Sequence, residues 1–428
     1  MTEMDEYNDA KATIADAHET MNRRRLEREA EEDSRHLVTI RQISAIDDIP
    51  GADLIKVATV EGWKVVIKAG EFAVDDLCVF FEVDSFLPLD DERYEFLRRN
   101  AITWEGVEGA RLRTIRLRKQ LSQGLALPLN IFPEITAEEL ADPDVRQKNF
   151  TGRLGIMKWD KPVSAQLAGK AKGNFPSWLR KSDQERAQNM GRDIFGYDDE
   201  LVPFDPAAIP QEALIAMMEK GELTQVYKDG SWFKVREATA SRLTQYEVTI
   251  KLDGSSMTVY HRDGAVGVCS RNLDLQLEGN EGNSFVAMAT SGLLEQLKRF
   301  GWNIALQGEL MGPGIQSNRE NFSHNRFFVY NIFDIQKGEF LSPEDREQSL
   351  AELNRLAKEN GIRFEHVPVL HKSATLLELG IKNMDELLAY AIGPSITHSV
   401  REGLVFKALD GRHQWKAISN LFLEKEKD

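Results

Sequence analysis

Between residues 36 and 130, apolar and polar residues alternate in short runs, which is the pattern of half-buried β-strands. Turn-forming residues separate the runs, and Glu61-Gly62 is placed to close a hairpin between two of them. A short closed barrel is the economical way to bury five or six strands in about a hundred residues. The runs that predict these strands are 37–40, 54–60, 63–67, 77–83, 111–119 and 124–127.

From Tyr246 onward, strand-like runs are separated by stretches with helical spacing, so a mixed domain is expected there. Ser342 is a predicted helix N-cap that is followed by proline, and Gly301 and Gly361 are predicted helix ends. Together with the barrel, this pattern predicts an α+β protein. The predicted helices cover 284–300, 343–360 and a short stretch after Asn383.

These patterns divide the chain into four parts. Residues 1–35 are highly charged and predict a solvated helix or a disordered arm, with an interaction tail as the alternative. Residues 36–130 form the predicted barrel, and residues 131–240 are an irregular connecting segment that leads into the last domain. Residues 241–428 form the predicted mixed domain.

Composition narrows the class of protein. The chain has 428 residues, of which 42% are hydrophobic, and this suits two or three globular domains. No apolar run reaches the ~20 residues of a membrane span, and the polar N-terminus does not resemble a secretory signal. The only two cysteines, Cys78 and Cys269, lie in separate apolar runs, which excludes zinc sites built from cysteine pairs. We therefore expect an intracellular, cytoplasmic protein that does not contact a membrane and is a monomer.

A net charge of −15 argues against a general polyanion binder, but positive charge is concentrated in one strand-like run. A basic strip of this kind on an acidic protein is suited to a nucleic-acid phosphate backbone. A purely structural barrel without a ligand is the alternative. The candidate nucleic-acid contacts are Arg111, Arg113, Arg116, Arg118 and Lys119.

The most informative stretch is Lys251-Leu252-Asp253-Gly254, which directly follows the apolar run 246–250. Side chains two apart on a strand share a face, so Lys251 and Asp253 are expected to point the same way. A buried lysine is stable when it loses its proton, and a neutral amine is a nucleophile. A surface hairpin that carries this motif by chance is the alternative.

Five further strand-like runs carry polar residues that a nucleotide pocket requires. In order they contain an arginine, a glutamate, an aromatic run that ends in aspartate, a glutamate followed by a lysine, and a second lysine. Each has an ordinary structural alternative, such as an aromatic core strand or a paired surface glutamate. The runs are 268–272, 304–310, 327–334, 402–407 and 413–419.

The order and spacing of these motifs over residues 251–416 resemble the six-part signature of covalent nucleotidyltransferases. That superfamily includes DNA ligases, RNA ligases and mRNA capping enzymes. The resemblance implies a domain of ATP-grasp-like antiparallel sheets plus helices. It also implies that Lys251 attacks the α-phosphate of ATP to form a lysyl-AMP, with Mg or Mn as the metal.

The resemblance also assigns roles to the lysines around the nucleophile. The pKa of a free lysine is near ~10.4, so neighbouring cations such as a metal and Lys416 are expected to lower it. Lys407 and Lys416 would neutralise negative charge on the phosphate in transfer. Many members of the superfamily have a lysine where this chain has Gln414, so one expected cation is missing.

Other motif residues are implied to hold the nucleotide and the metal. By resemblance, Arg271 and Glu309 look like ribose contacts, and Phe333 looks like the residue that stacks on adenine. Glu402 resembles the carboxylate that organises the metal, and Asp253 belongs to the site without a defined role.

The flanking regions indicate which branch of the superfamily the chain resembles. The barrel-like region begins like OB-fold domains that bind RNA, and it precedes the catalytic motifs, as in RNA ligases of the Deinococcus type. The segment 174–189 also looks like one found ahead of the catalytic lysine in RNA ligases. The resemblance implies sealing of 3′-hydroxyl and 5′-phosphate ends, above all at nicks in duplexes with RNA on the 3′-hydroxyl side. A non-sealing nucleotidyltransferase of the capping type and a degenerate RNA-binding protein are the alternatives.

Overall fold

The computed structural model describes residues 36–142, 145–160, 170–182, 184–190, 194–195, 202–204, 210, 224–228, 231–235, 244–411 and 414–425. These residues form two compact units. The first unit ends at Asp160, and the second covers the later residues and also includes residues 61–63. The predicted arm at 1–35 and most of the predicted connecting segment between 191 and 243 lie outside the described residues.

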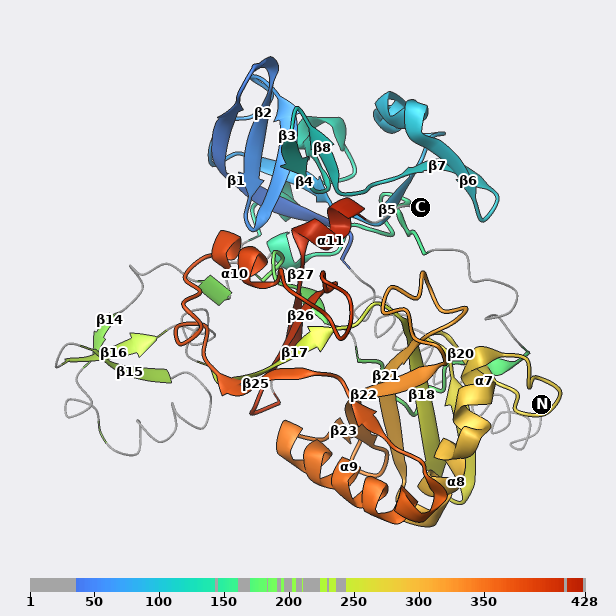
Figure 1. Cartoon of the computed structure of the whole chain (residues 1–428). Coiled ribbons are helices and arrows are strands. Elements are labelled where there is room, and N and C mark those ends of the chain that lie inside the picture. Colours follow the sequence, from blue (N-terminus) through green and yellow to red (C-terminus); the bar gives the residue numbers. More distant parts are fainter. Residues whose placement is uncertain are drawn as a thin grey trace, which may run out of the picture. The chain divides into compact units, whose positions relative to one another are not determined.

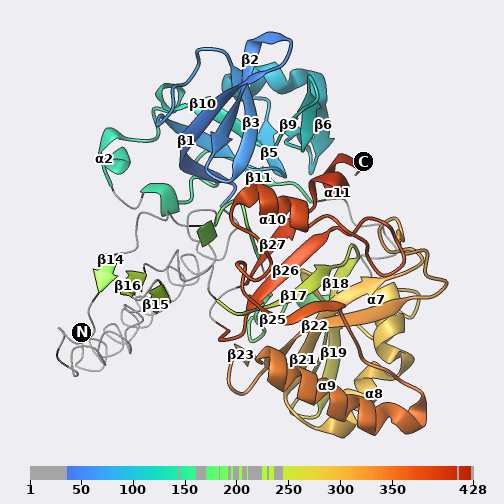
Figure 2. The same ribbon diagram turned by 60° about the vertical axis from the view of Figure 1, so that its left-hand side comes forward.

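The first unit is built on an antiparallel sheet whose strands match the predicted runs (Figure 2). The predicted hairpin is confirmed, and its first turn residue, Glu61, has a φ of 52°. The sheet has the order β10-β4-β1-β2-β3, with β1 Val38–Ile49, β2 Ala52–Val60, β3 Trp63–Lys68, β4 Leu77–Phe81 and β10 Leu125–Pro128.

A second, four-stranded sheet completes the first unit and shares its core. Phe81 of the first sheet and Leu87 of the second lie in one buried cluster with Phe132, Phe150 and Ile156. Residues beyond 130 therefore pack on the barrel strands rather than only connecting domains. The second sheet has the order β11-β5-β7-β6, with β5 Ser85–Pro88, β6 Ala101–Trp104, β7 Val107–Arg111 and β11 Met157–Lys158.

The second unit contains a large mixed sheet covered on one face by helices (Figure 1). Its order is β12-β20-β19-β18-β21-β22-β23, and β24 pairs with β22. The strands are β12 Ala171–Asn174, β18 Ser255–Arg262, β19 Ala265–Cys269, β20 Leu273–Leu275, β21 Ile304–Met311, β22 Arg326–Asp334, β23 Glu339–Phe340 and β24 Glu365–His366.

A five-stranded sheet in the same unit carries the motif lysines, and a three-stranded sheet lies within the predicted connecting segment. The five-stranded order is β13-β27-β26-β17-β25, and the three-stranded order is β14-β16-β15. Their bounds are β13 Glu185–Arg186, β14 Val202–Phe204, β15 Thr224–Lys228, β16 Ser231–Val235, β17 Tyr246–Lys251, β25 Val369–Ala374, β26 Gly403–Ala408 and β27 Gln414–Ile418.

The predicted helices are present, although the first is interrupted. A π-helical turn at Ala289–Leu293, in which Gly292 has a φ of 125°, separates α7 from α8. The N-cap at Ser342 is confirmed, because its hydroxyl accepts a hydrogen bond from the Asp345 N–H at 3.1 Å. Gly301 and Gly361 end their helices with left-handed φ values of 74° and 66°. The helices are α7 Ser284–Met288, α8 Leu294–Phe300, α9 Pro343–Ala357, α10 Met384–Tyr390 and α11 Asn420–Lys425.

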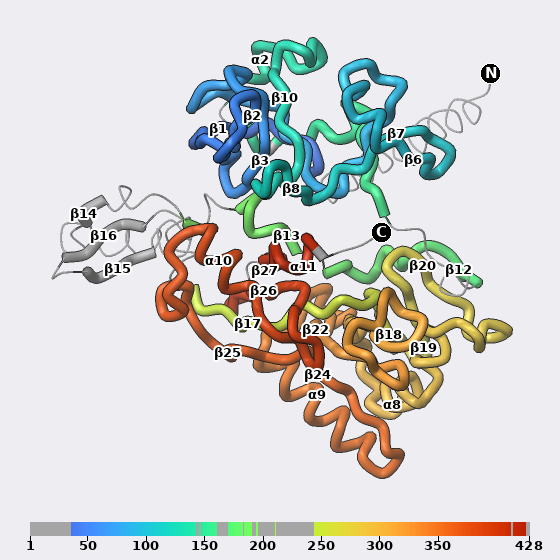
Figure 3. The backbone as a smooth tube through the Cα atoms, turned by 45° about the horizontal axis from the view of Figure 1, so that its top comes forward, coloured from blue at the N-terminus to red at the C-terminus, as the bar shows by residue number. Residues whose placement is uncertain are grey.

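Residues 170–182 and 184–190, which we call the bridging segment, connect the two large sheets of the second unit (Figure 3). At one end β12 pairs with β20, and at the other β13 runs parallel to β27. Within the described part of the chain, no helix is long and apolar enough to cross a membrane.

Candidate active site

The strand register places the motif lysines on one face of the five-stranded sheet. Lys251 pairs with Gly403 of β26, and Lys416 pairs with Val405 of the same strand. Lys407 itself lies on β26, so Gly403, Val405 and Lys407 are alternate residues of one strand. Paired residues share a face, and so do residues two apart on a strand. The opposite face is apolar, with Phe406 and Trp415 stacked at a centroid distance of 4.1 Å.

Lys251 ends β17 next to a carboxylate from the start of β26. Its Nζ lies 2.7 Å from Oε1 of Glu402, and the two side chains are 22% and 16% exposed. The following turn is tied to the large sheet, because the Gly254 N–H donates to Oε1 of Glu309 at 3.1 Å. A Cβ at position 254 would lie 2.4 Å from the Leu310 carbonyl oxygen, so only glycine fits this approach.

The charges around Lys251 are mainly negative. Burial works to lower the pKa of Lys251, but Glu402, Glu309 and Asp253 outweigh it and hold that pKa above its ordinary value. This differs from the expectation that neighbouring cations lower it. Burial, together with the charges of Glu402 and Asp253, raises the pKa of Glu309 to about 8, although Lys251 opposes the shift. One ammonium thus faces three carboxyl groups.

This surplus of carboxylates fits a hard divalent cation. Among the residues that the structure describes, no three His, Cys, Asp or Glu side chains are already grouped to hold a metal. Magnesium, however, is usually held by one or two carboxylates together with substrate phosphates, rather than by a cage of protein ligands. Asp253, Glu309 and Glu402 are the side chains around Lys251 that would serve.

Lys407 is buried and held by β22 of the other sheet. Its Nζ donates to Oδ1 of Asn331 at 2.8 Å and to the backbone carbonyl of Tyr330. Burial and the nearby charge of Arg346 lower the pKa of Lys407 well below its ordinary value, and Glu247 only partly offsets them.

Beside Lys407 lies a buried ion pair that the sequence did not suggest. Arg346 of α9 donates to both carboxylate oxygens of Glu247 on β17, at 2.5 and 2.6 Å. The sequence signal for this pair was Glu247 itself, because a glutamate within a mostly apolar strand is buried and a buried carboxylate requires a partner.

Gln414 belongs to a hydrogen-bond network centred on Ser182 of the bridging segment. Its Nε2 donates to the Ser182 hydroxyl at 3.1 Å, and Nδ2 of Asn331 donates to the same oxygen at 2.6 Å. Asn331 in turn holds Lys407. Ser182 and Asn331 were both missed from sequence, although a lone amide within the aromatic run 327–334 was a visible signal.

The structure does not bring all motif residues to Lys251. Phe333 lies on the same face of the large sheet as Glu309, but it pairs with Ala305. Ala305 is four residues before Glu309 on β21, which is a distance of roughly 13 Å along the strand. Its ring is 3% exposed and packs edge-on against Phe340 at 5.2 Å. Arg271 follows β19 and is exposed, and Lys416 is half-buried.

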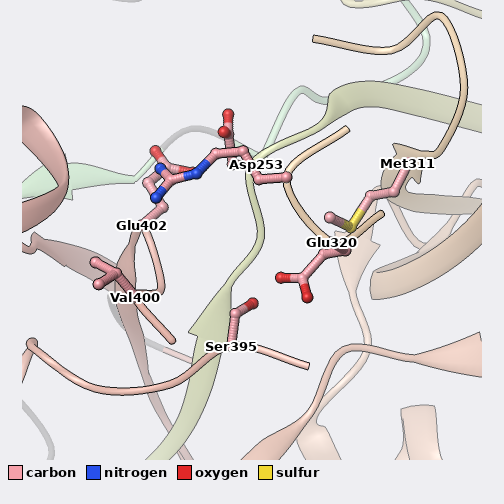
Figure 4. A pocket seen from close by; sticks show the side chains of 7 residues that line it. Asp253, Met311, Glu320, Ser395, Val400 and Glu402 are labelled. Atoms are coloured by element: carbon pink, nitrogen blue, oxygen red, sulfur yellow. The ribbon is translucent and has the colours of Figure 1, made fainter. Parts of the chain in front are cut away.

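A small pocket adjoins the carboxylates around Lys251 (Figure 4). Asp253 and Glu402 lie at one side of it, and Glu320 and Ser395 point toward each other at the other (Figure 4). Burial works to raise the pKa of Glu320, but hydrogen bonds from Ser395, Thr397 and His398 hold it below its ordinary value.

The basic strip of the first unit divides into two parts. Arg111 is half-buried, pairs with Asp84 at 2.8 Å and lies over the Trp159 ring at 3.7 Å. Arg113 is exposed, and the remaining cations lie on an exposed hairpin formed by β8 Ile115–Leu117 and β9 Gln120–Ser122. Its turn residues Arg118 and Lys119 have φ values of 51° and 69°.

A first unit of two sheets, followed by a two-sheet domain with a lysine among carboxylates, is the arrangement expected of a polynucleotide ligase. Two family models match the chain: an OB-fold domain over residues 37–129 and RNA ligase over residues 244–420. A comparison with curated proteins found no match.

Solved structures of one enzyme match almost the whole chain. A mutant of Naegleria gruberi RNA ligase without ligand is 39% identical, with a TM-score of 0.73, over 92% of this chain and 99% of that one. The same ligase with pyrophosphate is 39% identical, with a TM-score of 0.72, over 92% and 100%. A mutant with ATP and Mn is 38% identical, with a TM-score of 0.71, over 91% and 99%.

The chain therefore belongs to the family of ATP-dependent RNA ligases that carry an OB-fold domain before the ligase domain. The predicted fold class and enzyme class are confirmed.

Proposed function

We propose that this RNA ligase joins a 3′-hydroxyl to a 5′-phosphate through a lysyl-AMP on Lys251, and that its preferred substrate is a nick in duplex RNA or an RNA–DNA hybrid. ATP and Mg or Mn are the proposed cofactors, in line with the ATP, AMP and Mn in the Naegleria structures. The observation that carries the proposal is Lys251 at 2.7 Å from Glu402, on the same sheet face as Lys407 and Lys416.

In the first step, the Lys251 ammonium must lose a proton, because only the free amine is nucleophilic. Glu402 accepts a hydrogen bond from Nζ and so orients it. Nζ then forms a bond to the α-phosphorus of ATP while the α–β phosphoanhydride bond breaks and pyrophosphate leaves. When bound, the metal supplies positive charge to the phosphate oxygens.

In the second step, a 5′-phosphate oxygen of the RNA attacks the AMP phosphorus, the P–N bond breaks, and Lys251 regains a proton. In the third step, the 3′-hydroxyl loses its proton and attacks the 5′-phosphorus, and AMP leaves. Lys407 and Lys416 are proposed to stabilise the charge that develops on the phosphate.

The remaining motif residues are proposed to bind the nucleotide. Arg271 and Glu309 would contact the ribose, and Phe333 would stack on adenine if its cluster opens. Asp253 and Glu402, with Glu309 beside them, would hold the metal.

The adduct test uses ATP radiolabelled at the α-phosphate, with Mg or Mn and no RNA. Labelled protein is expected from the parent chain, and Lys251→Ala abolishes it. Lys372→Ala is the matched control, because Lys372 is an exposed lysine on the neighbouring strand β25. Label that survives in Lys251→Ala would place the nucleophile elsewhere, and label from GTP instead of ATP would favour a capping-type enzyme.

The substrate test compares matched nicked duplexes of RNA, DNA and both hybrids under identical conditions. Sealing is expected to be fastest when the 3′-hydroxyl strand is RNA. Equal rates on the all-DNA nick would contradict the proposed preference.

A further inference from the structure

An open groove lies beside the candidate active site and has no role in the steps above. Glu320 lines both this groove and the small pocket that Asp253 and Glu402 line, so the groove and the pocket adjoin at this residue. Three segments form the groove: the loop before β22, the residues at the start of β24, and Thr397. Its lining is Glu320, Asn321, Phe322, Ser323, His324, Arg326, Arg363, Glu365 and Thr397.

Both carboxylates of the groove are held by internal hydrogen-bond donors. Glu320 is 5% exposed and accepts from the backbone N–H groups of Thr397 and His398, at 2.6 and 3.1 Å, and from the Thr397 hydroxyl at 2.9 Å. Glu365 is held by the guanidinium of Arg326, whose Nε donates to it at 2.9 Å. Oxygens of both carboxylates are thus engaged by internal donors, and the charge of Glu365 is paired with that of Arg326.

One lining residue, Phe322, belongs to a packed apolar cluster that also contains Phe328. The rings of Phe322 and Phe328 stack at a centroid distance of 6.0 Å, and the Arg326 guanidinium lies 4.7 Å from each. Arg326 is thus fixed by an ion pair and by two rings, which makes it a rigid wall rather than a mobile side chain.

The groups that remain exposed are hydrogen-bond donors or cations. Arg363, His324, Ser323 and Asn321 are all exposed along the groove. Guanidinium, imidazole, hydroxyl and amide groups are the side chains that contact phosphate oxygens and ribose hydroxyls in nucleic-acid complexes. Because the lining carboxylate oxygens already accept internal hydrogen bonds, the exposed edge presents Arg363 and neutral donors to a polyanion even though the chain as a whole is acidic.

We infer that this groove binds the sugar–phosphate backbone of the RNA strand next to the break and leads its end to Lys251. The inference rests on the proposed function, which requires an RNA end beside Lys251. Arg363 contacts a phosphate, and the loop at Asn321–His324 contacts the adjoining ribose and phosphate.

The test measures binding separately from chemistry. A nicked RNA duplex with a 3′-deoxy end, which cannot be sealed, is titrated with the full chain at several salt concentrations. Arg363→Ala is expected to weaken binding roughly five- to thirtyfold and to reduce the slope of log affinity against log salt by about one, the signature of one lost phosphate contact. Arg363→Lys keeps the charge and is expected to recover most of both values.

Arg355→Ala is the matched control, because Arg355 is an exposed arginine on the neighbouring helix α9 that does not line the groove. It should leave affinity and slope unchanged. Self-adenylylation with ATP and metal, without RNA, should be the same in all three variants. An unchanged affinity and slope in Arg363→Ala, or an equal loss in Arg355→Ala, would overturn the inference.

The outcomes also separate this inference from the proposed function. A parent chain that binds nicked RNA through Arg363 but forms no adduct would contradict the proposed chemistry and support the groove. Normal RNA binding by Arg363→Ala with adduct formation intact would refute RNA binding in the groove and leave the proposed chemistry standing.

Discussion

Glu309 links the electrostatics of the site to the stability of the ligase domain. Its pKa is raised from 4.5 to about 8 in the folded chain. Between these values the native state keeps a proton that the unfolded state releases, so the free energy of unfolding falls as the pH rises. Glu309→Gln removes this titration and still offers an acceptor for the Gly254 N–H.

We therefore expect the melting temperature of Glu309→Gln, relative to the parent, to rise between about pH 5 and about pH 8.5, by roughly 2–4 °C for each kcal/mol that this titration contributes. Thermal melts without ATP and metal measure this. Glu359→Gln, at an exposed position after α9, is the control and should show no such trend. If the melting temperatures of Glu309→Gln and the parent differ by the same amount at every pH, the raised pKa of Glu309 is contradicted.

At the residue scale, the sequence indicated that Lys251 lies among charged residues but not whether they raise or lower its pKa. Lys251, Glu309 and Glu402 could be assigned because motif order fixes which strands they occupy. The pKa of Lys251 depends on distances between separate strands, and no local pattern encodes those distances. Gln414 illustrates the same point, since its partner Ser182 lies 232 positions away in the chain.

The bridging segment is an element whose contribution can be tested at one hydroxyl. Ser182 accepts from Asn331, and Asn331 holds Lys407. Ser182→Ala should lower the rate of self-adenylylation at saturating ATP about three- to tenfold, the effect of one lost hydrogen bond. Ser182→Thr keeps the hydroxyl and should restore the rate. Equal rates for Ser182→Ala and the parent would remove Ser182 from the positioning of Lys407.

The β8–β9 hairpin combines positive charge with backbone strain. Left-handed φ values cost non-glycine residues roughly 1–2 kcal/mol each, and both turn residues are cationic. Arg118→Asn with Lys119→Gly, a sequence suited to this turn, should raise the melting temperature. If the hairpin binds RNA, the same variant should also raise the KM for nicked duplex severalfold.

The neighbouring β6–β7 turn supplies the control for the hairpin. Glu105 has a φ of 49°, so Glu105→Gly relieves comparable strain without removing a cation. It should raise the melting temperature and leave the KM for nicked duplex unchanged. An equal rise in KM for both variants would show that turn rigidity, rather than the cations, supports sealing.

Elements with a local signal could be predicted, and those defined by long-range pairing could not. Ser342 and Gly361 mark the ends of one helical stretch, and strand alternation identified β1 to β4. The π turn at Ala289–Leu293 interrupts a stretch with continuous helical spacing. The basic run 111–119 looked like one strand but contains the end of β7 and the separate hairpin strand β8.

At the scale of the whole molecule, the first unit has its own core and the second holds every motif carboxylate and lysine. Phe150, Leu154 and Ile156 belong to the core of the first unit, so a truncation that spares both cores must remove residues 1–160 rather than 1–130. Residues 61–63, which group with the second unit, are lost with it. A thermal melt must therefore confirm that the remaining chain is folded.

The truncated chain is expected to retain self-adenylylation with ATP, because Lys251 and its neighbours are all present. Sealing of nicked duplex should fall roughly tenfold or more, since the exposed cations of the hairpin are lost and phosphate contacts dominate nucleic-acid affinity. A chain that lacks only residues 1–35 is the control and should seal like the parent. Full sealing by the truncated chain would refute a substrate-binding role for the OB-fold domain, whereas loss of self-adenylylation in a folded truncation would mean that this domain takes part in the first chemical step.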